Sequence, residues 1–146
     1  MIEIESLGPV PASSDVTFLC PKTAQSFEGG LCTGLLPTAF KMHDDGISVT
    51  WIEFFEPPPP SLEQAASAIK NDLKPKKSGV LACATVSRLT EIAFKLGLEA
   101  AVTHDPQKSN HGHSLITGWP DNLACRVALT RAFVKLVPNT DVLGFV

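Results

Sequence analysis

The spacing of apolar and polar residues changes several times along the chain, and each spacing predicts a different element. Residues 47–51, Ile-Ser-Val-Thr-Trp, alternate as the residues of a half-buried strand do, and the run at 52–55 predicts that its end is buried on both faces. Apolar runs at 79–86 and 98–103 predict two more strands, and 113–117 predicts another.

Helical spacing separates these strands. The helix expected from residue 61 begins with a capping box, Ser61 with Gln64, and ends at Lys74-Pro75. Its apolar positions share one face: Leu62, Ala65, Ala66, Ile69 and Leu73. A second helix is expected after a cap at Ser87, with Gly97 as its terminator, and a third after a cap at Asp121. The apolar positions of these two are Leu89, Ile92, Ala93 and Leu96, then Leu123, Val127, Ala128, Phe133 and Leu136.

These elements predict one compact α+β domain over residues 1–146, with a mixed sheet and about three helices. Residues 79–103 are typical of a parallel βαβ unit with a short crossover. Residues 1–45, with four prolines and the pair Gly29-Gly30, are expected to be irregular apart from a possible short strand at 16–19. Pro57 to Pro60 stop the preceding strand and favour a stiff polyproline connector within the domain.

The composition is that of a globular protein, and its charge argues against one class of partner. Hydrophobic residues make up 44% of the 146 residues and charged residues 18%, which is not the composition of a disordered chain. The net charge of −3 gives no general attraction to phosphate backbones, and the one basic cluster, Lys70, Lys74, Lys76 and Lys77, is typical of a solvated helix end. Nucleic acid is therefore not an expected partner.

The ends and the cysteines indicate a cytoplasmic protein. The N-terminus lacks the pattern of a signal peptide, and no apolar run reaches the roughly 20 residues that cross a bilayer. The four cysteines, Cys20, Cys32, Cys83 and Cys125, form no CxxC motif. In a reducing compartment they are expected to be buried thiols that act as small apolar side chains.

Candidate chemistry gathers in residues 103–119, which hold three of the four histidines. Histidine is the side chain whose charge changes nearest neutral pH, and it is the commonest metal ligand. If residues 100–104 and 113–117 are adjacent antiparallel strands, the loop between them covers residues 105–112. His104 and His113 would then face each other at its base, about 4.5–5.5 Å apart at Cβ.

Three chemistries fit this segment. In the first, His104 and His113 act as general base and acid, while Asp105 or Asn110 fixes a tautomer. In the second, Ser109, Asn110, Gly112 and their backbone amides form an anion pocket, to which Ser114 can add a hydroxyl. In the third, a minor alternative, His104, His111 and His113 bind a divalent metal. The first uses the polar residues without demanding a fixed metal geometry, so we expect a site without a required metal or cofactor.

The same residues also fit a purely structural loop. Asp-Pro, Ser-Asn and His-Gly pairs are common in turns, and Asn110 can stabilise a loop through its own backbone. His111 is expected to belong to that turn, and His43, beside Asp44 and Asp45, to a surface turn.

Two resemblances bear on the histidines. The two-histidine phosphoesterases carry histidine, an apolar residue, Ser or Thr, then an apolar residue; here Ser114 directly follows His113, so that pattern is not met. Residues 45–49, Asp-Gly-Ile-Ser-Val, followed by His104-Asp105-Pro106, Asn110 and His113, resemble small uncharacterised bacterial proteins over about residues 37–120. This second resemblance implies no activity.

Two functions of different kinds follow. The first is a small intracellular enzyme, or a protein that binds a nucleotide or phosphate ester, with a two-histidine site and a small anionic ligand. The alternative is a non-catalytic interaction module, such as an accessory subunit of a bacterial operon-encoded complex. That alternative predicts an exposed apolar patch at Trp51, Phe54, Phe55 or Trp119.

Overall fold

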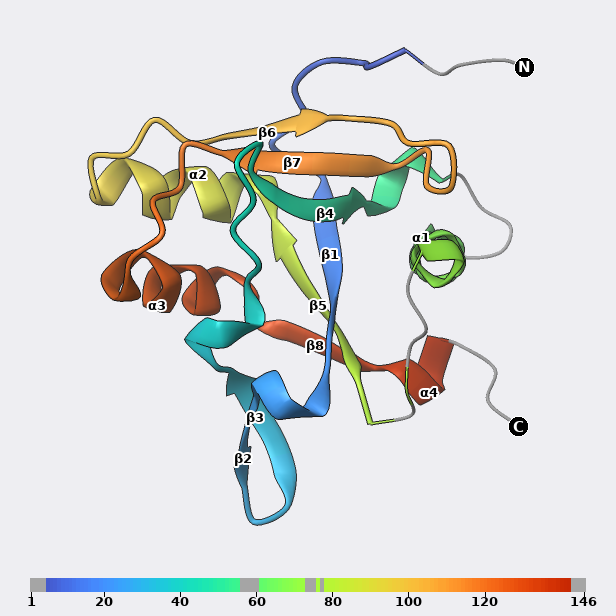
Figure 1. The fold of residues 1–146 in the computed structure, drawn as a ribbon, viewed down its shortest axis with the longest axis vertical. Helices are drawn as coiled ribbons and strands as arrows, with labels where there is room; N and C mark the ends of the chain where they lie inside the picture. The colour runs from blue at the N-terminus through green and yellow to red at the C-terminus, as the bar shows by residue number, and fades with distance from the viewer. Residues whose placement is uncertain (1–4, 56–60, 73–75, 77, 143–146) are drawn as a thin grey trace.

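The computed structural model describes residues 5–55, 61–72, 76 and 78–142. Its centre is a six-stranded sheet in the order β6-β7-β4-β1-β5-β8 (Figure 1). The strands of this sheet are β1 (Asp15–Cys20), β4 (Ile47–Trp51), β5 (Val80–Thr85), β6 (Ala101–His104), β7 (His113–Thr117) and β8 (Lys135–Pro138). The helices are α1 (Ser61–Asp72), α2 (Val86–Lys95), α3 (Leu123–Ala132) and the short α4 (Asn139–Val142). The expected α+β class is confirmed.

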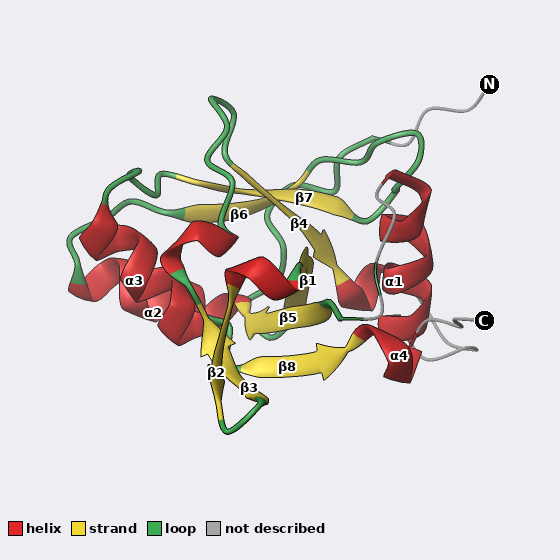
Figure 2. Ribbon diagram, turned by 60° about the horizontal axis from the view of Figure 1, so that its bottom comes forward, coloured by secondary structure: helices red, strands yellow, loops and turns green. Residues whose placement is uncertain are grey.

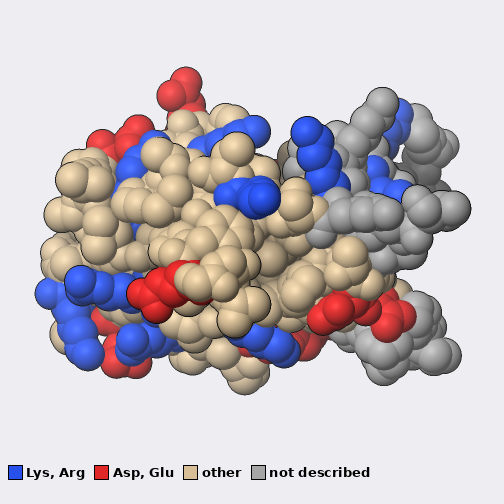
Figure 3. All heavy atoms as spheres, turned by 90° about the horizontal axis from the view of Figure 1, so that it is seen from below, with Lys and Arg blue, Asp and Glu red and all other residues tan. Residues whose placement is uncertain are grey.

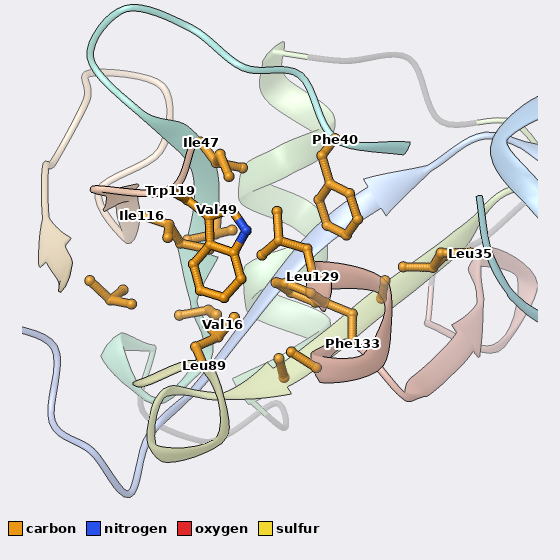
Figure 4. Close-up of a cluster of buried hydrophobic side chains, with 14 of the residues drawn as sticks. Val16, Leu35, Phe40, Ile47, Val49, Leu89, Ile116, Trp119, Leu129 and Phe133 are labelled. Carbon is orange, nitrogen blue, oxygen red and sulfur yellow. The ribbon is translucent and has the colours of Figure 1, made fainter. Parts of the chain in front are cut away.

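The helices cover the two faces of the sheet unequally. Helices α2 and α3 lie side by side on one face, and α1 lies on the opposite side (Figures 1 and 2). The first face carries the main core, which includes Val16, Val49 and Ile116 from the strands and Leu89 and Leu129 from the helices (Figure 4). Three aromatic rings, Phe18, Phe40 and Phe133, pack against this core with centroids 5.0–5.6 Å apart. We call this face the core face.

Helix α1 packs over only part of the other face, which we call the α1 face. Ala65 and Ala66 of α1 are buried against Leu81 and Cys83 of β5 and against Ile52. The apolar face expected for this helix is therefore confirmed where the structure describes its side chains. The α1-face residues of β4, β7 and β6 farther from α1, such as Ser48 and Thr103, are exposed or half-buried. One half of this face is thus accessible to solvent.

The N-terminal part is more regular than its sequence predicts. Residues 1–45 were expected to be irregular apart from a possible short strand at 16–19; that strand is β1, and it lies in the middle of the sheet between β4 and β5. The polar residue Thr17 is fully buried in β1 and donates its hydroxyl to the Ala82 carbonyl at 2.9 Å. Because its hydroxyl is hydrogen-bonded, the buried Thr17 interrupts the apolar pattern of the sequence but not the strand.

A hairpin follows β1 and projects from the body of the molecule (Figures 1 and 2). It pairs β2 (Gln25–Glu28) with β3 (Leu31–Leu35) as a separate two-stranded sheet. Gly29 and Gly30 form its turn with φ values of 57° and 81°, which are the positive angles that a two-residue hairpin turn requires. The Gly-Gly pair was therefore a hairpin signal rather than a mark of irregular chain.

The expected parallel βαβ unit is wrong. Strands β5 and β6, which α2 connects, belong to the same sheet but are separated by β1, β4 and β7. Every described strand pairing is antiparallel. Apolar periodicity identifies strands but does not name their neighbours, so the order of the sheet could not be read from it.

The helix boundaries need corrections, the largest at the third helix, which ends at Ala132, so that Leu136, expected on that helix, lies in β8. Thr85, not Ser87, caps α2 by accepting the Arg88 N–H at 3.2 Å. Asn122, not Asp121, caps α3 by accepting the Cys125 N–H at 2.9 Å. Gly97 has the expected left-handed conformation, with φ of 72°. The proline connector at 57–60 and the side chain of Ser61 lie outside the described residues.

Candidate functional site

The two histidines expected to face each other lie on opposite faces of the sheet. His104 is paired with Ser114, and the ladder continues for one more residue because the Asp105 N–H donates to the His113 carbonyl at 2.8 Å. A shift of one residue moves a side chain to the other face of a strand. His104 and Ser114 therefore lie on the core face and His113 on the α1 face. The predicted two-histidine pair is not formed.

His104 is a buried structural residue, only 1% exposed. Its Nδ1 accepts the Leu7 N–H at 3.0 Å, and its Nε2 lies 2.7 Å from the His111 carbonyl oxygen. Because a carbonyl can only accept, Nε2 carries the proton and Nδ1 does not. Both ring nitrogens are thus occupied, and His104 has no free nitrogen for catalysis or for a metal.

Aromatic rings and the N-terminal segment enclose His104. The rings of Trp51 and Phe54 lie 5.4 and 4.9 Å from the imidazole centroid. The N-terminal segment runs along β6, where Gly8 accepts the His104 N–H at 2.9 Å and the Val10 N–H donates to Val102 at 2.9 Å. His104 therefore joins the N-terminal segment, the 105–112 loop and the end of β4. No pattern in the sequence predicted this pairing along β6.

Asn110, expected among the catalytic residues, organises the loop instead. It is 4% exposed, and its Nδ2 donates to Thr50 Oγ1 at 2.8 Å while its Oδ1 accepts the Gly112 N–H at 3.1 Å. Both ends of the amide are therefore engaged, as in the structural alternative. We assign Asn110 no direct contact with a ligand.

The three residues expected to bind a substrate are placed differently from one another. Ser114 is fully buried on the core face and donates to the Gly112 carbonyl at 3.2 Å. Gly112 lies against Phe55, since a Cβ at this position would be 2.5 Å from that ring. Ser109 is half-buried in the loop. Ser114 and Asn110 cannot contribute to the predicted anion pocket, because both side chains are buried and hydrogen-bonded within the protein.

His113 is the histidine of this segment whose ring contacts a carboxylate. Its Nδ1 lies 2.9 Å from the Asp105 carbonyl oxygen and 3.1 Å from the Asp105 carboxylate, so Nδ1 is protonated and donates to both. The His113 side chain is 10% exposed and that of Asp105 46%. Among the described residues Nε2 makes no hydrogen bond, and the ring is almost wholly buried. Asp105 thus orients an imidazole whose second nitrogen is not engaged by the described part of the chain.

A row of polar side chains connects His113 to the region under α1. Strand register places His113 opposite Thr50, Thr50 opposite Thr17, and Thr17 opposite Cys83. Paired residues share a face of the sheet, so all four project on the α1 face. The Cys83 thiol donates to Thr17 Oγ1 at 3.4 Å. Because two strands separate Cys83 from His113, the row does not form a Cys–His nucleophile pair.

Burial also makes Cys83 a poor nucleophile. The pKa of its thiol is raised by burial, an effect that outweighs the hydrogen bond with Thr17 and the positive charge of Lys135. Burial likewise raises the pKa of Cys20 to about 11, with a smaller contribution from Cys32. Neither thiol is readily ionised at neutral pH, so we assign neither of them the role of a nucleophile.

The minor metal alternative does not fit. His104 has no free nitrogen, His113 lies on the other face, and His111 is exposed. Among the described residues, no group of three or more His, Cys, Asp or Glu side chains is arranged to hold a metal ion. The residues present therefore do not form the site that the three histidines suggested.

The aromatic patch expected for an interaction module is not formed as predicted. Trp119 is 8% exposed and donates its indole N–H to the Cys125 carbonyl at 2.8 Å. Trp51, Phe54 and Phe55 are half-buried, and Phe54 packs against both of the other two rings. The more exposed large apolar side chains lie elsewhere, among them Leu31 at 74% and Phe94 at 84%.

Two further findings bear on function. No helix in the described part of the chain is long and apolar enough to span a bilayer. On the surface shown in Figure 3, Lys and Arg are interspersed with Asp and Glu, without a broad region of one sign. Comparison of the chain with protein-family models, curated proteins and solved structures finds no match.

Proposed function

We propose that this protein is a small enzyme in which His113, oriented by Asp105, acts as a general base on water or on a ligand hydroxyl. The observation that carries the proposal is the Nδ1–H bond to Asp105, at 3.1 Å from the carboxylate, which leaves Nε2 unprotonated and without a hydrogen bond among the described residues. A carboxylate that fixes the tautomer in this way also stabilises the imidazolium that forms when Nε2 takes a proton.

The charges around His113 favour a proton-donating ligand over a phosphate ester. Asp105 lies in direct contact with the imidazole, and its half-exposed carboxylate repels a phosphate. A phosphate site needs several donors or cations that converge on one point. Asn110, which the sequence offered as one such donor, is engaged with Thr50 and Gly112. The reaction class supported best is therefore hydrolysis by an activated water.

Substitution within the same loop tests this proposal. His113→Gln should lower kcat/KM for hydrolysis of p-nitrophenyl acetate by about 10²–10⁴-fold, the usual contribution of a general base. His111→Gln is the matched control, since His111 is exposed in the same loop and its side chain is not used. An equal loss in both variants, or no catalysis by the native protein above the His113→Gln level, contradicts the proposal.

Chemical modification supplies a readout that does not depend on the substrate. Diethyl pyrocarbonate acylates an accessible, unprotonated imidazole nitrogen, so His113 should be modified and His104 protected in the native protein. Peptide mapping by mass spectrometry measures both in one sample. Protection of His113 equal to that of His104 would show that Nε2 is not reachable, and the enzyme proposal would fail.

An interaction module remains the second candidate, and the projecting hairpin supports it. Phe27 and Leu31 are 41% and 74% exposed, and an isolated two-stranded hairpin is only marginally stable in water. If the hairpin binds a second copy, sedimentation should show association that depends on concentration and that Leu31→Ser reduces. Phe94→Ser, on α2, is the control, since Phe94 is also largely exposed, at 84%.

A further inference from the structure

A concave region lies away from His113 and shares no residue with its surroundings. It is a hollow of about 590 Å³ between the segment at residues 37–43 and the beginning of α3. Pockets that bind small molecules usually measure about 300–1,000 Å³, so the volume is sufficient for a small ligand. Its apolar lining includes Phe40, Met42 and Leu123, and its charged lining includes Lys41 and Arg126.

Arg126 is held rigidly at the edge of this hollow. Its Nε donates to Asp121 at 2.6 Å, and its Nη1 donates to the Pro37 and Phe40 carbonyls at 3.0 and 2.7 Å. These bonds use three of the five guanidinium N–H groups. Within the described residues Nη2 makes no hydrogen bond, so its two donors stay available. The guanidinium is therefore fixed before any ligand arrives, which lowers the entropic cost of binding.

The charges of the hollow favour an anion although the whole chain has a net charge of −3. The one carboxylate in the lining, Asp121, is already paired with Arg126. Lys41 is exposed and has no ion-pair partner among the described residues. The two positive charges of Arg126 and Lys41 thus outnumber the single carboxylate charge of the lining. Leu123, 70% exposed, adds an apolar surface beside them.

We propose that this hollow binds a small organic anion, with its carboxylate or phosphate head at Arg126 Nη2 and Lys41 and its apolar body against Met42 and Leu123. A rigid guanidinium favours an oxyanion because two parallel N–H donors match two of its oxygens. The apolar lining accounts for the body of the ligand, since burial of apolar surface adds to affinity.

Titration followed by ¹⁵N–¹H NMR tests the proposal with four probes. Phenylacetate and phenyl phosphate combine an anionic head with an apolar body, and the tighter of the two identifies the preferred head. Acetate lacks the body, and benzyl alcohol lacks the charge. Saturable shifts confined to residues 37–43 and 121–126 are expected with the first two probes. Shifts that do not saturate, or that centre elsewhere, would overturn the proposal, as would equal binding of benzyl alcohol.

Variants separate this site from a general effect of charge. Lys41→Glu should weaken phenylacetate or phenyl phosphate binding about tenfold or more, where each factor of ten equals 1.4 kcal/mol. Leu123→Ser should weaken binding severalfold without a change in charge. Both residues are exposed, so their replacement leaves the carbonyl contacts of Arg126 intact. Lys70→Glu on α1 is the matched charge control, and an equal effect of this variant would overturn the proposal.

Discussion

At the scale of the residue, two histidines nine positions apart have opposite roles. His104 uses both ring nitrogens to bind backbone groups and is enclosed by Trp51 and Phe54. His113 uses one nitrogen to bind Asp105 and leaves the other open. Their residue types are identical, so the difference comes from the hydrogen bonds and the face of the sheet that each position receives.

Replacement of each histidine with alanine should distinguish the two roles by the loss in the free energy of unfolding. His104→Ala removes a fully buried ring and leaves the Leu7 N–H and the His111 carbonyl without their partner. We expect it to lower the free energy of unfolding by about 3–5 kcal/mol, the range for a large buried side chain with lost hydrogen bonds. His113→Ala should cost about 1–2 kcal/mol, because Asp105 can turn to solvent. Urea denaturation measures both, and a larger loss in His113→Ala would contradict these roles.

The carboxylate of Glu53 gives a prediction of pH dependence. Burial raises the pKa of Glu53, and the nearby Asp15 carboxylate adds to the rise against the opposing effect of backbone N–H donors. A raised pKa means that the folded protein binds this proton more tightly than the unfolded chain does. Glu53 therefore favours folding when protonated at low pH, and this contribution is lost as pH rises through the folded-state pKa.

Glu53→Gln should for that reason stabilise the protein at neutral pH. Glutamine can still accept the Asp15 N–H, which now donates to Glu53 Oε1 at 2.7 Å, without adding a charge beside Asp15. We expect a gain of a few tenths of a kcal/mol at pH 7, as for other solvent-screened charges, that shrinks as pH falls through the raised pKa of Glu53. Thermal unfolding across this range measures it, with exposed Glu28→Gln as the control. A gain that grows on acidification contradicts the assignment.

At the scale of the element, the sequence predicted which segments form regular structure better than how they pair. The strands at 47–51 and 113–117 and the helical face of 62–69 could be predicted because their apolar periods are clear. The register of β6 with β7 could not, since both possible registers pair Val102 with an apolar residue, Ile116 in the observed register and Leu115 in the expected one. The backbone hydrogen bond from the Asp105 N–H to the His113 carbonyl continues the observed register, in which His104 and His113 lie on opposite faces of the sheet.

Two turn glycines should differ in how much they tolerate alanine. Gly118 has φ of 77°, and a Cβ there would lie 2.2 Å from the Glu99 carbonyl oxygen. Gly97 has φ of 72°, but a Cβ there meets nothing within 4 Å. Gly97→Ala should cost about 1–2 kcal/mol from the left-handed conformation alone. Gly118→Ala should cost about 1–3 kcal/mol more because of the steric clash. Denaturant unfolding of both variants tests this order, and equal costs would count against the close approach of the two backbone segments.

At the scale of the whole molecule, the sheet separates two environments. The core face holds the main hydrophobic core with α2 and α3, while the α1 face carries the polar row from His113 to Cys83. Three of the four cysteines, Cys20, Cys83 and Cys125, are buried, as composition suggested, and Cys32 on the hairpin is half-buried. The three buried cysteines can therefore serve as chemical probes of unfolding.

Thiol labelling should therefore have two phases. Cys32 should react with iodoacetamide in the native protein, whereas Cys20, Cys83 and Cys125 should react only when the sheet and its helices open. Burial raises the pKa of Cys20 and Cys83, which slows them further because the thiolate is the reactive form. Mass spectrometry over time in increasing urea follows each site. Rapid labelling of Cys83 under native conditions would contradict the packing of α1 over β5.

The central claim is that Asp105 fixes His113 in one tautomer while His104 is held in the other. Long-range ¹H–¹⁵N correlation spectra of the histidine rings report the protonated nitrogen of each residue directly, with His104→Ala and His113→Gln assigning the signals. The hydrogen bonds predict a proton on Nε2 of His104 and on Nδ1 of His113 in the neutral rings. A proton on Nε2 of neutral His113 would contradict the account, because no unprotonated Nε2 would remain to act as a base.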